Sequence, residues 1–86
     1  MRQFVYIIKS STGLNTRFVG LLSKLAKGYG DTVISVTKGG ETAKTSQLMK
    51  LTCMGVKQGD QVVVSADGPS QDRAIVAARA FFEEHL

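Results

Sequence analysis

The chain has 86 residues, enough for one domain with one modest core. It is 43% hydrophobic and 21% charged, which is ordinary for a globular protein and argues against disorder. The formal net charge of +4 comes from basic residues spread along the whole sequence, a distribution that favours an acidic protein partner over direct nucleic-acid binding.

The same composition bears on compartment and chemistry. No apolar run approaches the roughly 18–20 residues that span a bilayer, and a strand-like pattern starts directly after Met1. We therefore expect no signal peptide, no membrane insertion and a cytoplasmic location. Cys53 is the one cysteine, which excludes an internal disulfide. Without a metal-ligand cluster, a nucleotide loop or paired carboxylates, we expect no metal, no cofactor and no independent enzymatic activity.

The first half of the chain predicts three strands and one helix. Residues 2–9 hold a run of β-branched and aromatic side chains, which predicts a buried strand. Apolar side chains at helical spacing predict a helix over 16–27, and Gly28 and Gly30 are expected to end it in the manner of a left-handed C-cap. Strands follow over 32–37 and 41–44, joined by a Lys-Gly-Gly turn.

The second half predicts a short helix, a strand and a long helix. Thr45 and Ser46 are both favourable N-cap residues, so a short helix is expected after them, ending before Gly55. A run of valines predicts a central strand over 61–66. Ser70 is expected to start the last helix, which continues through the aromatic residues near the end of the chain.

The predicted order of elements is therefore βαββαβα, with short connections and no internal repeat. One sheet with its helices on one face would bury all the amphipathic stripes. We predict a single α+β domain over residues 1–86. Periodicity alone leaves the order of the strands in the sheet open.

The segment before the first predicted helix carries a family resemblance. Residues 13–18, Gly-Leu-Asn-Thr-Arg-Phe, are similar to the phosphoacceptor loop of the HPr family. HPr proteins are histidine-phosphorylated carriers of the bacterial sugar phosphotransferase system, and their loop has the sequence Gly-Leu-His-Ala/Thr-Arg-Pro. This chain has Asn15 where the family has the acceptor histidine, and Phe18 where it has proline.

The resemblance covers essentially the whole chain. It continues through 26–28, 48–56 and 59–68, the last being similar to the family pattern Gly-x-x-Val-x-Ile-x-Ala-x-Gly. Together, in order and at near-family spacing, these weak motifs are specific. The resemblance implies an open-faced β-sandwich, in which a four-stranded antiparallel sheet is covered on one face by three helices.

Asn15 changes the chemistry that the resemblance implies. Carrying a phosphoryl group needs a nitrogen with a free lone pair and a pKa near 7, which imidazole has and an amide lacks. Three interpretations of Asn15 stay open: a plain helix cap, a neutral stand-in for histidine in a docking surface, or an engineered replacement. His85, the one histidine, is expected to be a solvated residue near the chain end rather than a displaced acceptor.

The rest of the anion site is implied to persist. By resemblance, Thr16, Arg17 and Phe18 would bind phosphate through the amides of the helix N-terminus and the Arg17 guanidinium. Phe18 restores an N–H that proline lacks. Its ring is predicted to be either a core aromatic or an exposed contact residue.

A regulatory serine is the second implied site. Many HPr proteins carry a serine at the start of the second helix that a dedicated kinase phosphorylates, and Ser46 lies in that region. Matching residues 48–51 to the family instead places Gln47 on the serine position. The other interpretation of Ser46 is a plain N-cap.

The family's partner surface is implied to combine the first helix, the loop before it and the second helix. Leu48 is expected to be a core residue, whereas Met49 is the better candidate for exposure. Basic residues around an apolar centre would suit an acidic partner. The matching positions are Asn15, Thr16, Arg17, Gly20, Lys24, Lys27, Leu48, Met49 and Lys50.

The sequence therefore predicts an HPr-like docking or regulatory protein without histidine phosphotransfer, similar in that respect to Crh, an HPr paralogue of carbon catabolite repression. The implied partners are phosphotransferase-system proteins, a carbon-catabolite regulator and the HPr serine kinase. The alternative is a phosphocarrier that acts in the usual HPr manner. A third possibility, an assembly role without any link to that system, would involve none of these partners.

Overall fold

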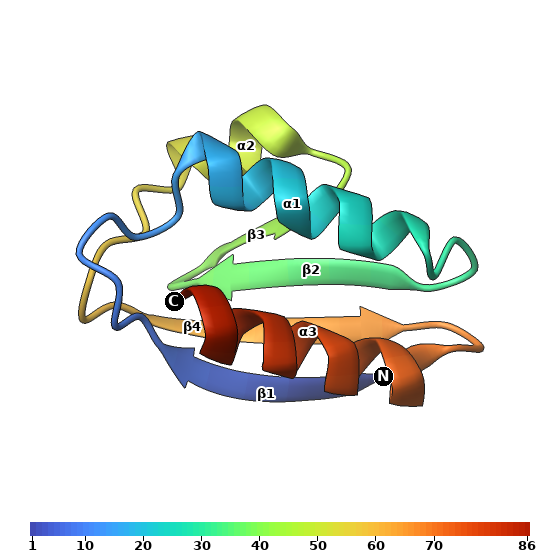
Figure 1. The fold of residues 1–86 in the computed structure, drawn as a ribbon. Coiled ribbons are helices and arrows are strands. Elements are labelled where there is room, and N and C mark those ends of the chain that lie inside the picture. Colours follow the sequence, from blue (N-terminus) through green and yellow to red (C-terminus); the bar gives the residue numbers. More distant parts are fainter.

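Four strands form one antiparallel sheet in the order β1-β4-β2-β3, and three helices cover one of its faces (Figure 1). The computed structural model describes residues 1–86. This is the predicted βαββαβα open-faced sandwich, with the predicted strand at residues 61–66 in the interior of the sheet. The elements are β1 (Arg2–Ile7), α1 (Thr16–Lys27), β2 (Val33–Lys38), β3 (Glu41–Lys44), α2 (Leu48–Cys53), β4 (Gln61–Asp67) and α3 (Gln71–His85).

The core lies between the sheet and the helices. Val64 in β4 is fully buried and stands opposite Phe4 of β1 and Val36 of β2 in the strand register. Phe82 of α3 meets Phe4 edge to face, with ring centroids 5.8 Å apart. The buried helical side chains recur at helical spacing, as the sequence predicted: Phe18, Val19 and Leu22 in α1, Leu51 in α2, and Ala74, Ala78 and Phe82 in α3.

The prediction of a buried first strand is wrong. β1 is an edge strand, and Val5 and Ile7 are 59% and 54% exposed on the uncovered face of the sheet. Residues 4–8 are all apolar, so they show none of the alternation that marks a half-buried strand. Only the arrangement of the layers reveals which side chains face the helices.

Two predicted helix caps differ from the structure. Gly28 ends α1 in a right-handed conformation, with φ of −70°, rather than a left-handed one. Gln47 is the N-cap of α2, and neither Thr45 nor Ser46 takes that place. Thr45 is buried, and its N–H donates to Ile34 O at 2.9 Å. The connection thus still bonds to the sheet at Thr45, which delays the helix start.

The loop before α1 is held by a close backbone approach. Gly13 has φ of +61° and packs against the backbone carbonyl of Val56, where a Cβ atom would collide. The next residue, Leu14, donates its N–H to Val56 O at 3.2 Å. Glycine is required here by both conformation and space, and the contact fixes where α1 begins.

The end of α3 is tied to the end of β1. The backbone oxygen of Leu86 accepts from the N–H groups of Lys9 and Ser10, at 2.7 and 2.9 Å, and Leu86 itself is buried. In Figure 1 this chain end lies at the same end of the molecule as the loop between β1 and α1. No helix is both long and apolar enough to cross a membrane.

Candidate functional site

Asn15 is the N-cap of α1. Its backbone is extended, with φ of −100° and ψ of 171°, and its side-chain Oδ1 accepts from the Phe18 N–H at 2.9 Å. Its Nδ2 donates to Thr12 Oγ1 at 3.2 Å. The helix-cap interpretation of Asn15 is therefore confirmed.

The cap leaves part of the helix terminus open. The backbone N–H groups of Thr16 and Arg17 have no hydrogen-bond partner in the protein, whereas that of Phe18 is taken by Asn15. The exposed Arg17 guanidinium also makes no ion pair or hydrogen bond. Of the three residues predicted to bind an anion, two thus present free donors and the third does not.

The Phe18 ring belongs to the core. Its side chain is 4% exposed, and its ring centroid lies 5.1 Å from that of Phe81 and 5.3 Å from that of Phe82. The core-aromatic interpretation is confirmed, and the exposed-contact interpretation is wrong. Phe18 therefore joins the start of α1 to the end of α3.

A hollow of about 210 Å³ lies at this junction. It brings Asn15 and Arg17 together with Leu21 and His85, two residues that the sequence did not connect with the site. Leu21 follows Arg17 by one helical turn, a spacing that could have revealed it. No local pattern pointed to His85, because only the packing of α3 against α1 brings it here.

His85 is exposed, as expected, but it is not a free tail residue. It is the last residue of α3, and its ring centroid lies 4.5 Å from that of Phe81 and 6.3 Å from that of Phe18. The buried Leu86 anchors the chain directly after it. The imidazole is thus held beside the start of α1.

A second hollow, of about 340 Å³, lies between α1 and α2 and is mostly apolar. Met49 is 81% exposed at its rim, as predicted, but Leu48 is 42% exposed and not the core residue that we expected. Thr52 and Cys53 were missed, although they follow Met49 at helical spacing. The hollow joins four predicted docking residues to three others; its lining is Thr16, Val19, Gly20, Leu48, Met49, Thr52 and Cys53. We call this hollow the α1–α2 groove.

None of the predicted basic residues lines the α1–α2 groove. Lys24, Lys27 and Lys50 are exposed and make no ion pair. Lys24 and Lys27 lie in the last turn of α1, and Lys50 lies in α2. Positive charge near an apolar groove fits an acidic partner.

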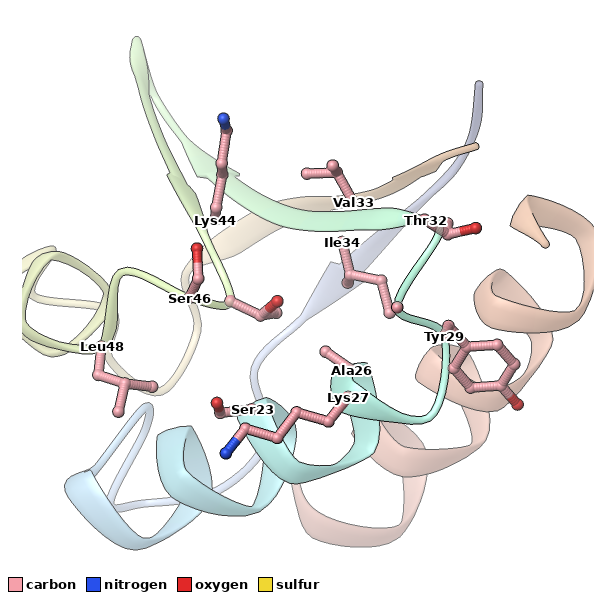
Figure 2. A pocket seen from close by; sticks show the side chains of 12 residues that line it. Ser23, Ala26, Lys27, Tyr29, Thr32, Val33, Ile34, Lys44, Ser46 and Leu48 are labelled. Carbon is pink, nitrogen blue, oxygen red and sulfur yellow. The ribbon is translucent and has the colours of Figure 1, made fainter. Parts of the chain in front are cut away.

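Ser46 is exposed, and its hydroxyl makes no hydrogen bond within the protein. It lines a third hollow, of about 580 Å³, between the end of α1, the start of β2 and the β3–α2 connection. Figure 2 shows Ile34 pointing toward Ala26 across this space, while Lys44 points away from it. The charged groups around this hollow do not converge on a common point.

Asp60, whose pKa is shifted, lies outside these hollows. Lys38 Nζ lies 2.8 Å from Asp60 Oδ2 and donates to Gly55 O at 2.9 Å. The bond from Lys38 to the Asp60 carboxylate, together with one from the Lys57 N–H at 2.8 Å, holds the pKa of Asp60 below its ordinary value. The ion pair fastens the β2–β3 hairpin to the segment before β4.

Comparison with known proteins decides the family. The family pattern described as "PTS HPr component phosphorylation site" matches residues 2–84. The chain belongs to the HPr family. A relative named phosphocarrier protein HPr, from Haemophilus influenzae, is 37% identical over 68 residues, which cover 79% of each chain.

Solved HPr structures agree with the fold. The structure of HPr-C-His from Thermoanaerobacter tengcongensis is 30% identical, covers 98% of this chain and 93% of its own, and superimposes with a TM-score of 0.88. Crh of Bacillus subtilis, described as a catabolite repression protein, is 23% identical, with coverage of 100% and 98% and a TM-score of 0.76. At that identity, Crh supports the shared fold alone.

Proposed function

We propose that this HPr-family protein is a docking and regulatory member of the phosphotransferase system in which residue 15 carries no phosphoryl group. The observation that carries the proposal is the amide of Asn15 at the start of α1, bonded to the Phe18 N–H. The amide nitrogen lone pair is delocalised into its carbonyl, so it offers no nucleophile. The side chain acts as a cap where family members, by resemblance, carry an acceptor histidine.

The docking surface is argued separately from residue 15. The α1–α2 groove presents an exposed methionine and leucine, Met49 and Leu48, next to free lysines. Flexible apolar side chains with a basic surround suit a partner that has an acidic rim and a hydrophobic patch. We infer that the whole 86-residue chain serves as one such module, with the first enzyme of the system or a catabolite regulator as the partner.

The binding test uses the first enzyme of the system in calorimetric titration. Met49→Glu places a charge in the α1–α2 groove, and we expect it to weaken binding about tenfold or more. Val76→Glu is the matched control, because Val76 is 68% exposed on α3 and lines none of the hollows. Equal affinity of both variants and the parent chain would refute docking through this groove.

The transfer test uses the same enzyme with phosphoenolpyruvate, followed by peptide mapping under alkaline conditions. We expect no phosphoryl group on residues 13–18. A phosphoryl group on that peptide would refute the proposal and support carriage in the usual HPr manner. The Haemophilus influenzae HPr serves as the positive control for the donor.

A regulatory role is tested at Ser46. Its hydroxyl is exposed and unbonded directly before the N-cap of α2, which leaves it accessible to a kinase. With the HPr serine kinase and ATP, we expect acid-stable phosphate that Ser46→Ala abolishes. Its absence would restrict the proposed function to docking.

A further inference from the structure

The hollow beside Asn15 still contains a nucleophile. His85, the one histidine of the chain, lines the same space as Asn15 and Arg17. It comes from the opposite end of the sequence, so no loop motif could place it there. The cap at residue 15 therefore does not leave the site without an imidazole.

The His85 ring is held in place by its neighbours, and its nitrogens make no bond to the protein. Its ring centroid lies 4.5 Å from that of Phe81 and 6.3 Å from that of Phe18, so two aromatic rings restrict its orientation. Neither ring nitrogen takes part in a hydrogen bond or an ion pair with the protein. A lone pair is thus available toward solvent.

Groups that would hold a phosphoryl oxygen lie in the same hollow. The Arg17 guanidinium is always charged, carries several donors and has no competing partner in the protein. The backbone N–H group of Arg17 is also free. The nucleophile and the donors thus come from α3 and α1 respectively, and the Phe18 ring packed against the end of α3 holds the two helices together.

We propose that His85 is a phosphorylation site, and that its imidazole takes a phosphoryl group from the phosphohistidine of a protein docked on the α1–α2 groove. This proposal rests on the docking function proposed above. The unprotonated ring nitrogen of His85 attacks phosphorus and forms a new N–P bond. The N–P bond of the donor breaks, and its electron pair returns to the donor ring.

The exchange balances without any further reactant. A protonated phosphohistidine donor leaves as neutral imidazole, and neutral His85 becomes the protonated phosphohistidine. Arg17 pairs with the charged oxygens during the transfer. The product places new negative charge at the carboxyl end of α3, beside Arg17, where it would weaken attraction to an acidic partner. His85 would thus report the phosphorylation state of the donor.

The test incubates the intact chain with the first enzyme of the system and phosphoenolpyruvate, followed by intact mass and site mapping at alkaline pH. We expect one acid-labile phosphoryl group on His85, which is absent in His85→Gln. Glu84→Gln is the matched control on the same helix turn, because Glu84 is exposed and lines no hollow. Arg17→Ala should slow the transfer about tenfold or more.

The outcomes separate the two proposals. No phosphoryl group on the chain, while the Haemophilus influenzae HPr is modified, overturns the role of His85. So does a phosphoryl group that persists in His85→Gln. If the unmodified chain still binds the enzyme, with weaker binding of Met49→Glu, the docking function stands without the His85 site.

Discussion

Replacing Asn15 by alanine tests whether its side-chain amide, in the loop before α1, serves as a helix cap. The substitution removes the oxygen that accepts from the partly buried Phe18 N–H at 2.9 Å. It also removes the bond from Nδ2 to Thr12 Oγ1, but that bond is exposed and contributes little. The effect of the substitution is therefore the loss of one capping hydrogen bond.

The expected loss of stability follows from the burial of the Phe18 N–H. An N-cap lost to alanine costs about 0.5–2 kcal/mol, and a partly buried donor left unpaired places Asn15→Ala in the upper half, at about 1.5 kcal/mol. In a domain of this size, that lowers the melting temperature by roughly 6–12 °C. Asn15→Asp should be as stable as the parent or more stable by about 0.3–1 kcal/mol, because it keeps the acceptor and interacts with the helix dipole. The first turn of α1 holds no other acidic residue.

The measurement is urea unfolding followed by circular dichroism, with the thermal midpoint as a second readout. A backbone control isolates the bond: an ester in place of the Phe18 amide removes the N–H and keeps the ring. In that ester background, Asn15→Ala should cost less than about 0.5 kcal/mol, because the donor is already gone. If Asn15→Ala costs the same in both backgrounds, or nothing in either, the cap does not stabilise α1.

Three further predictions concern the frame around the site. Phe82→Ala should destabilise the fold by about 3–5 kcal/mol in urea unfolding, because Phe82 is fully buried and packs against the rings of Phe4, Tyr6 and Phe18; an effect below about 1 kcal/mol would contradict the packing. Gly13→Ala should cost about 2 kcal/mol or more, because its φ is positive and its Cβ would meet the Val56 carbonyl. The pKa of Asp60 is lower in the folded chain than its unfolded value of 3.8, so the carboxylate stabilises the fold at a pH above 3.8. This contribution disappears as the pH falls through the folded pKa. Asp60→Asn should therefore be less stable than the parent at neutral pH and equal to it in acid; a pH-independent difference would refute the pairing with Lys38.

The elements that the sequence predicted best are those with periodic patterns. The helix over 16–27 was predicted with its observed bounds, because its apolar stripe and the following glycines mark both ends. The inner strand was predicted over 61–66, and in the structure it continues for one more residue, to Asp67. The exposed face of β1 was not predictable, because residues 4–8 are apolar on both faces.

The site was partly predictable, for a similar reason. Asn15 and Arg17 lie within the segment that carries the family resemblance, and Met49 follows the spacing of its helix. The start of α2 was misplaced, because Thr45 and Ser46 are intrinsically good caps, yet the buried Thr45 still bonds to the sheet. His85 lies 70 residues from Asn15 along the chain, and only the packing of Phe18 against Phe81 brings them to one hollow.

By resemblance to the family loop, residues 15 and 18 replace a histidine and a proline, and we interpret the two differences as one arrangement. Proline at position 18 has no N–H, so the side chain of Asn15 would have no donor there to cap. Phe18 supplies that donor at 2.9 Å and also places its ring against Phe81, beneath His85. A change at residue 15 alone would remove a nucleophile and leave an open helix end. The pair instead closes one amide of that end and builds an aromatic support for the imidazole that we propose as the new phosphoryl acceptor.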